Sequence, residues 1–216
     1  MITAADIKIT HEKIAPYINY TPVQHSPYLS QLADADVYLK LDCIQKTGSF
    51  KFRGAISKLT SIPVSERKSN AYAASTGNHG AAVSLGASIL GMKCNVIVPE
   101  GTSPAKLEMI KMYGGTIEFY GTDCLEAEAH AQKLVLENGG TYVSPYNDEA
   151  VIRGQGTMGV ELSESLTNID AVFVAVGGGG MIGGLGTYLK TVFTNIEIEV
   201  TGYKGVFKEF VNIKID

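Results

Sequence analysis

The sequence has few cysteines, no block of basic residues and no apolar run long enough to cross a membrane. Cys43, Cys94 and Cys124 lack metal or disulfide spacing, so we expect reduced thiols, buried as small hydrophobic residues, in a cytoplasmic protein. A net charge of −4 argues against nucleic acid and anionic membranes as partners. The N-terminus has neither a basic region nor a long apolar stretch, so we expect no signal peptide.

The composition is that of a soluble globular protein with one large domain or two small ones: 216 residues, 45% hydrophobic and 19% charged. From residue 70, short apolar runs alternate with helical periodicity, which predicts parallel βαβ units with right-handed crossovers. The expected strands are 37–41, 72–74, 94–98, 116–120, 141–143, 171–176 and 196–201. The expected helices are 2–18, 26–32, 81–90, 103–113, 123–136, 148–166 and 181–193. Because the run 171–176 is entirely apolar, we expect it to be a buried parallel strand.

The segment 45–55, Gln-Lys-Thr-Gly-Ser-Phe-Lys-Phe-Arg-Gly-Ala, places a lysine at the start of a predicted helix. We expect Ser49 to be the N-cap and Lys51 to lie in the first turn, where the helix dipole disfavours a cation. The dipole and the nearby charge of Arg53 would both favour the neutral amine. A neutral lysine amine is the form that Schiff-base chemistry with a carbonyl requires, although an isolated lysine would be read as solvated.

Four consecutive glycines, Gly177 to Gly180, lie between a predicted strand and a predicted helix. Backbone N–H groups without side chains, at a helix N-terminus, form an anion cradle. The glycines at 178, 180 and 183 also match the dinucleotide fingerprint, and Glu197 or Glu199 lies near the spacing of its ribose-binding acid. An oxidoreductase that binds nicotinamide or flavin is therefore an alternative, although the fingerprint comes unusually late in the chain.

A second turn, 75–80, has the sequence Ser-Thr-Gly-Asn-His-Gly between a predicted strand and a predicted helix. Its N–H groups and hydroxyls suit a small anion such as an amino-acid carboxylate. We expect no catalytic role for His79, and Asn78 taken alone could be a turn residue. The other histidines, His11, His25 and His130, are expected to be solvated or structural. Glu126, Glu128 and His130 do not share one helix face, so we expect no metal site there.

Together the three motifs resemble those of the fold-type II pyridoxal-phosphate enzymes, in the family's order and approximate spacing. The most similar branch is that of the serine/threonine dehydratases and serine racemases, and the resemblance runs from about residue 7 to 198. It implies an α/β fold with two parallel-sheet domains, like that of the tryptophan synthase β subunit, and the cofactor in the cleft between them. The large domain would comprise 1–65 plus 144–216 and the small domain 66–143. Beyond Ile198 the pattern fades, so the large domain is expected to be incomplete at its C-terminus.

The resemblance assigns a role to each motif. Lys51 would hold pyridoxal phosphate as a Schiff base and then remove the substrate's α-proton, Phe50 would lie beside the pyridine ring, and Asn78 would hydrogen-bond the phenolic oxygen. The phosphate would be held by Gly177, Gly178, Gly179, Gly180 and Met181. The substrate carboxylate would be held by Ser75, Thr76, Gly77, Asn78 and His79. Thr76 would also be catalytic, because it matches the serine whose hydroxyl serves the second substrate face in the racemases. Gly154, Gly156 and Gly159 would permit close packing against the cofactor face.

The function that this resemblance implies is dehydration and deamination of L-threonine or L-serine to a 2-oxo acid and ammonia. The alternatives are amino-acid racemisation on the same site and a cofactor-binding remnant without turnover. The β-branch of Thr76 favours elimination over racemisation. A homodimer or larger homo-oligomer is expected. In longer relatives Mg²⁺ can bind, but its ligands and the group facing the pyridine nitrogen belong to a region without a counterpart here.

Overall fold

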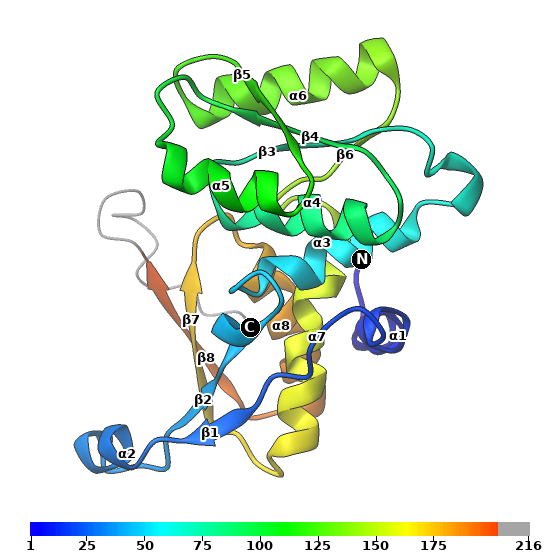
Figure 1. Cartoon of the computed structure of the whole chain (residues 1–216). Coiled ribbons are helices and arrows are strands. Elements are labelled where there is room, and N and C mark those ends of the chain that lie inside the picture. Colours follow the sequence, from blue (N-terminus) through cyan, green and yellow to red (C-terminus); the bar gives the residue numbers. More distant parts are fainter. Residues whose placement is uncertain (203–216) are drawn as a thin grey trace.

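The computed structural model describes residues 1–202, which form an α/β fold with two parallel sheets and one antiparallel strand pair (Figure 1). The expectation that residues after about Thr201 do not complete the large domain falls almost entirely outside the described residues. Within this part of the chain, no helix is both long and apolar enough to span a membrane.

The strands of the larger sheet are all parallel, as the alternating pattern predicted, and their order is β5-β4-β3-β6. Its strands are β3 (Ala71–Ala74), β4 (Cys94–Val98), β5 (Thr116–Phe119) and β6 (Thr141–Tyr142), and its helices are α4 (Asn78–Ile89), α5 (Pro104–Met112) and α6 (Cys124–Asn138). Alternate strand residues face opposite sides. Ala73 and Val96 pack with α4 and α5, whereas Tyr72 and Ile97 pack against α6. All of these elements lie within 66–143, but the domain boundaries themselves remain a prediction.

A second layer is built on the helices α1 (Ala4–Ile14), α3 (Lys51–Ser61), α7 (Glu149–Ser165) and α8 (Gly180–Val192), with the parallel strands β7 (Ala171–Val176) and β8 (Glu197–Gly202). One apolar cluster joins α1, α7, α8 and the β7–β8 pair. The other joins Phe52, Ile56 and Leu59 of α3 to α4 and the four-stranded sheet. Helix α3 therefore lies at the junction between the two halves (Figure 1).

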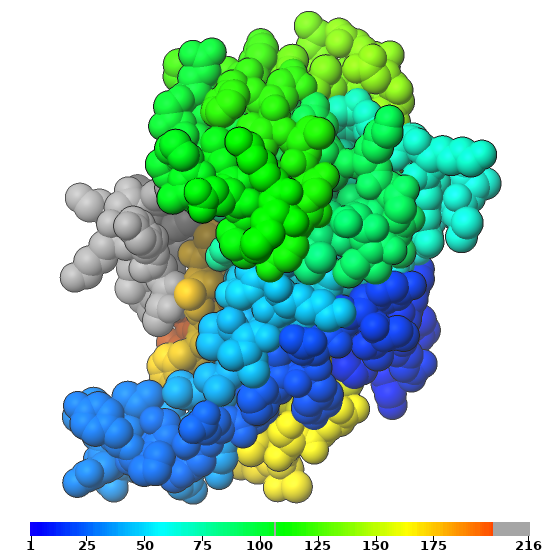
Figure 2. Space-filling model, viewed as in Figure 1, coloured from blue at the N-terminus to red at the C-terminus, as the bar shows by residue number. Residues whose placement is uncertain are grey.

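The strand at 37–41 and the helix at 26–32 were predicted, but strand β1 (Val23–His25) and its antiparallel pairing were not. The short strands β1 and β2 (Tyr38–Lys40) pair antiparallel, and α2 (Pro27–Ala33) connects them. No residue of α2 is buried, and the segment projects from the body of the molecule (Figure 2). Two short 3₁₀ turns, η1 (Asp42–Ile44) and η2 (Val64–Glu66), complete the described elements.

Several helices begin at a side chain that caps their first turn. Thr3 forms a capping box with Asp6. The side chains of Asp123 and Asp148 accept hydrogen bonds from the first turns of α6 and α7. Ser103 precedes the N1 proline of α5, as expected, but its side chain makes no capping hydrogen bond. These caps fix where the helices begin.

Two burial predictions were wrong. Strand β7 is parallel, but it is buried on one side only: Val174 is buried, whereas Phe173 is 75% exposed. An apolar run cannot distinguish a strand covered on both faces from one covered on a single face. Of the three cysteines only Cys94 is buried, and burial raises the pKa of its thiol to about 11; Cys43 and Cys124 are exposed.

The glycines of α7 do pack closely, but against helices. A Cβ at Gly154 would lie 2.5 Å from the carbonyl oxygen of Arg53 on α3. On the opposite face a Cβ at Gly156 would lie 2.9 Å from the carbonyl oxygen of Gly184 on α8, and one at Gly159 would meet Tyr188. Helix α7 therefore holds α3 and α8 at close range, and the cofactor-face interpretation of these glycines was wrong.

Candidate active site

Lys51 is the first residue of α3, in the first turn as predicted. The residue before it, Phe50, already has helical dihedral angles and occupies the N-cap position without a side-chain cap. The prediction that Ser49 is the N-cap was therefore wrong, and the Ser49 hydroxyl is buried without a hydrogen-bond partner. The helix thus begins one residue later than a serine cap would place it.

The amine of Lys51 is partly buried. Its Nζ donates a hydrogen bond to the carbonyl oxygen of Pro145 at 2.8 Å and lies 5.3 Å from the centre of the Phe50 ring. Burial lowers the pKa of Lys51, which favours the neutral, nucleophilic amine. The predicted contribution of Arg53 was wrong, because its guanidinium is buried in ion pairs with Asp42 and Glu161.

The glycine loop, residues 177–180, connects β7 to α8. Gly179 adopts φ +85°, a conformation that glycine tolerates without strain. The first intrahelical hydrogen bond runs from Gly183 N to Gly179 O at 2.9 Å, so the N–H groups just before it have no partner within the helix. A Cβ at Gly177 or Gly179 would meet no atom within 4 Å. The loop therefore has the backbone donors and the open space of an anion cradle.

Lys51 and the glycine loop line one cavity of about 420 Å³, within the range typical of small-molecule sites. Its lining residues are Phe50, Lys51, Tyr146, Ala175, Val176, Gly177, Gly178, Gly179, Gly180, Met181 and Ile182. The structure thus brings together every residue predicted for the lysine and phosphate ends of the site, from motifs about 130 positions apart.

Tyr146 is a lining residue that the sequence analysis missed. Its ring lies against Gly178, where an added Cβ would collide with it, and its backbone lies 2.8 Å from the Cβ position of Gly180. No motif identifies Tyr146. The one signal is its place beside Pro145, whose carbonyl accepts the hydrogen bond of Lys51.

The turn 75–80 is not among the residues that line this cavity. Ser75 accepts a hydrogen bond from Gly77 N at 3.2 Å, and Asn78 is exposed at the start of α4. His79 is buried, and its Nε2 lies 2.7 Å from the carbonyl oxygen of Val143. Burial, with a smaller contribution from the charge of Lys51, lowers the pKa of His79 to about 4. The carboxylate and phenolic-oxygen roles of this turn therefore remain predictions.

Neither candidate for the ribose-binding acid of a dinucleotide site lies next to the glycine loop. The glycine loop follows Val176, at the carboxyl end of β7, whereas Glu197 and Glu199 are paired with Ala171 and Phe173. At about 3.3 Å per residue, Glu197 pairs about 17 Å from the loop end of the strand and Glu199 about 10 Å from it. A ribose-binding acid belongs at the carboxyl end, next to the glycines.

Of the other histidines, His25 and His130 have local partners, whereas Nδ1 of His11 is buried without a hydrogen-bond partner. His130 lies 2.7 Å from Glu118 and stacks on Tyr120, with ring centroids 3.7 Å apart. His25 contacts Ser30 at 3.1 Å. Glu126, which is four residues before His130 on α6, accepts a hydrogen bond from Thr122 N at 2.6 Å.

The fold and the cavity define an α/β protein in which an anion cradle and a lysine amine line one cavity, and this donor set fits a small aldehyde that carries an anionic group. The family model described as pyridoxal-phosphate dependent enzyme matches residues 14–209, so the chain belongs to that family. Pyridoxal phosphate is the cofactor that the family implies. Within residues 1–202 no Ser, Cys, Asp or Glu side chain lines the cavity.

Three similar proteins are dehydratases, deaminases or racemases of amino acids. The chain is 39% identical over 199 residues to the catabolic L-threonine dehydratase TdcB of Staphylococcus aureus, covering 92% of this chain and 58% of the relative. The structure of maize serine racemase matches with a TM-score of 0.91 and 31% identity, covering 95% of this chain and 62% of that one. The structure of the processed form of threonine deaminase isoform 2 from Solanum lycopersicum matches with a TM-score of 0.89 and 31% identity. This match covers 94% of this chain and 56% of that one. The chain therefore spans about three fifths of the length of these relatives.

Proposed function

We propose that the chain catalyses pyridoxal-phosphate-dependent dehydration and deamination of L-threonine or L-serine to a 2-oxo acid and ammonia. The observation that carries this proposal is the single cavity shared by the Lys51 amine and the glycine loop. The 39% identity to an L-threonine dehydratase supports the substrate class. The identity of the 3-hydroxy amino acid is left open between threonine and serine.

The residues act in complementary ways. The amine of Lys51, once it leaves the Pro145 carbonyl, holds the cofactor and later takes the α-proton of the substrate. The N–H groups of Gly177 to Gly180 and Met181 hold the phosphate, and Phe50 flanks the ring. When bound, pyridoxal phosphate supplies an aldehyde for the amines and an electron sink for the charge left by the α-proton.

The substrate end of the site rests on the turn 75–80. In this proposal Ser75, Thr76, Gly77, Asn78 and His79 hold the carboxylate. Asn78 also hydrogen-bonds the phenolic oxygen of the cofactor. His79 takes part through its backbone, because its ring is buried against Val143. Since the turn lies outside the cavity lining, it must move toward the glycine loop to act this way.

The direct test is product formation. Purified chain with added pyridoxal phosphate is given L-threonine or L-serine, and ammonia and the 2-oxo acid are quantified in parallel. We expect both products in equal amounts, with none from Lys51→Ala. Tight cofactor binding without either product would support the non-turnover alternative.

Racemisation is the second candidate, favoured by the likeness to maize serine racemase. It needs a proton donor or acceptor on both faces of the substrate, and Thr76 would serve the second face.

We propose in addition that the protein acts in the cytoplasm and that it is a homodimer or a larger homo-oligomer. We propose no Mg²⁺ ligands on this chain: the resemblance places them in longer relatives, and residues 1–202 contain no group of three His, Cys, Asp or Glu side chains that could hold a metal ion.

A further inference from the structure

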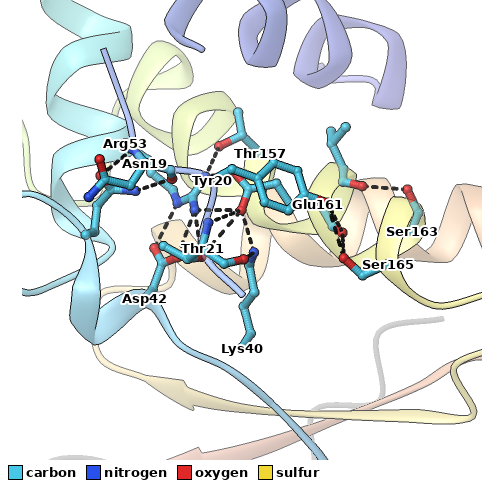
Figure 3. Close-up of polar contacts among 12 residues, drawn as sticks. Asn19, Tyr20, Thr21, Lys40, Asp42, Arg53, Thr157, Glu161, Ser163 and Ser165 are labelled. Carbon is cyan, nitrogen blue, oxygen red and sulfur yellow. Dashed lines mark hydrogen bonds and ion pairs between the residues drawn. The ribbon is translucent and has the colours of Figure 1, made fainter. Parts of the chain in front are cut away.

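Four charged side chains form a cluster beside α3 (Figure 3): Asp42, Arg53 and Glu161, which are buried, and Lys40, which is partly buried. Arg53 and Glu161 are fully buried, and Asp42 is 8% exposed. The cluster contains two cations and two anions, so its formal charge is balanced. Ions buried to this degree persist only when they are paired and hydrogen-bonded.

Arg53 is the centre of the cluster. Its Nε and Nη2 donate to the two oxygens of Asp42, each at 2.8 Å. Its Nη1 and Nη2 donate to the two oxygens of Glu161 at 2.5 and 2.9 Å. The guanidinium fork therefore makes two bidentate pairs at once, which a lysine ammonium cannot do.

Hydroxyl groups complete the cluster. Thr21 Oγ1 donates to Asp42 at 2.6 Å and accepts from Arg53 Nη2 at 3.1 Å, and Arg53 Nη1 donates to Thr157 at 3.3 Å. Lys40 pairs with Glu161 and also donates to the Thr21 carbonyl at 2.5 Å. The cluster thus ties α3 to α7, to η1 and to the chain that enters the β1–β2 pair.

We propose that Arg53, Asp42 and Glu161 are positioning residues that hold the first turn of α3, and so place the Lys51 amine against the glycine loop. Arg53 lies two residues after Lys51, in the same turn, so a shift of its guanidinium moves the start of α3 directly. The inference rests on the proposed role of Lys51 and adds the groups that fix its place.

The packing of the helices supports this assignment. At Gly154, an added Cβ would lie 2.5 Å from the Arg53 carbonyl and 2.7 Å from Gly54 Cα, so α3 and α7 touch backbone to backbone beside the cluster. On its other face α7 touches α8 at Gly184, four residues after the glycine loop ends. A continuous chain of contacts therefore runs from the first turn of α3 through Arg53, Glu161 and α7 to α8 and the glycine loop.

The experiment uses Arg53→Lys, which keeps the charge and removes the fork. The first readout is the apparent pKa of Lys51 in the protein without cofactor, from the pH dependence of its acylation by acetic anhydride, with exposed Lys133 as internal standard. If the cluster positions Lys51, loosening the first turn admits water, and the pKa should rise by about one unit. The Arg53→Lys substitution leaves in place the other titratable side chains around this amine, which are His79 on α4 and Tyr146 before α7.

The second readout is the amount of pyridoxal phosphate fixed to Lys51 by borohydride at neutral pH. It should fall about tenfold, in line with the smaller fraction of neutral amine. Neither readout requires turnover. The positioning role of the cluster can therefore be refuted while the proposed reaction stands, and the proposed reaction can be refuted while the positioning role stands. If Arg53→Lys does not fold, Thr21→Val removes only one hydroxyl of the cluster and should shift both readouts in the same direction by less.

The matched control is Lys58→Gln. Lys58 pairs with Asp148 at 2.6 Å and joins the same two helices, but it does so near the opposite end of α3. We expect unchanged Lys51 acylation and cofactor fixation. A lower melting temperature for Arg53→Lys or Thr21→Val with both readouts at parental values would overturn the proposal, as would an equal shift in Lys58→Gln.

Discussion

The Nζ atom of Lys51 donates a hydrogen bond to the carbonyl oxygen of Pro145, 94 residues later in the chain, at 2.8 Å. This contact joins the first turn of α3 to the segment that leaves the four-stranded sheet. Because the amine and Tyr146 share the cavity, the residues after β6 form one wall of the lysine site. The hydrogen bond to the Pro145 carbonyl thus orients the Lys51 amine beside this wall.

The first prediction concerns Thr76. Elimination needs a proton-transfer group on one substrate face, whereas racemisation needs one on each. The threonine hydroxyl is on a β-branched side chain with restricted χ1, so we expect dehydration to exceed racemisation. The measurement is the ratio of D-serine to pyruvate formed from L-serine with pyridoxal phosphate and Mg²⁺. Thr76→Ser should raise this ratio, and D-serine in clear excess in the parent protein would refute the dehydratase proposal.

The second prediction concerns the glycine loop. Gly179→Leu places a side chain in the open space of the cradle, so we expect cofactor retention to weaken about tenfold or more. The positive φ of Gly179 adds a folding cost of about 1–2 kcal/mol, so the readout is cofactor affinity in the folded fraction. Gly183→Ala, later in α8, meets only Ile152 at an ordinary 3.7 Å and is the control. Equal affinity in Gly179→Leu and the parent would exclude this loop as the phosphate site.

The third prediction is a loss of stability in acid caused by His79. Burial depresses the pKa of His79 in the folded protein to about 4, from an ordinary value of 6.5. The unfolded chain therefore binds the proton more readily, and the stabilisation present above pH 6.5 is lost as the pH falls toward 4. At about 1.4 kcal/mol per pH unit, the loss is about 3 kcal/mol.

The check is the free energy of unfolding at several pH values in His79→Gln, which cannot gain this proton. We expect the variant's curve to be flatter than the parent's between pH 6.5 and 4. Parallel curves for His79→Gln and the parent would show that His79 does not titrate as the structure requires.

The fourth prediction concerns the open face of β7. Phe173 is 75% exposed between the exposed residues Ala171 and Ala175, and this apolar surface should promote association of copies of the chain. We expect Phe173→Ser to lower the concentration-dependent mass seen by sedimentation. Leu125→Ser, on α6 and also 75% exposed in the parent, is the matched control. A monodisperse, highly stable parent monomer would contradict the prediction.

The sequence predicted the fold where periodicity and caps act locally. The four-stranded sheet follows from alternating strands and helices, and Asp123 and Asp148 begin their helices as caps should. The glycine loop and Lys51 were found because each motif carries its own chemistry. Burial was harder to predict, since an apolar run such as Ala171–Val176 has the same sequence whether one face or both are covered.

Contacts between distant segments could not be predicted. The guanidinium of Arg53 is only two residues from Lys51, but it pairs with Asp42 and with Glu161, 108 residues later. Tyr146 carries no motif and reaches the glycine loop only through the tertiary fold. Such relationships depend on how α3, α7 and α8 pack, which single-sequence patterns do not encode.

The central claim is that Lys51 carries the cofactor in the glycine-loop cavity, and its most direct test is borohydride reduction of the cofactor-loaded protein followed by peptide mass mapping. We predict one pyridoxyl-phosphate adduct per chain on Lys51. We also predict loss of the long-wavelength absorption in Lys51→Ala, with the fold preserved. A stoichiometric adduct on another lysine, such as Lys46 or Lys106, or an unchanged adduct in Lys51→Ala, would contradict the claim.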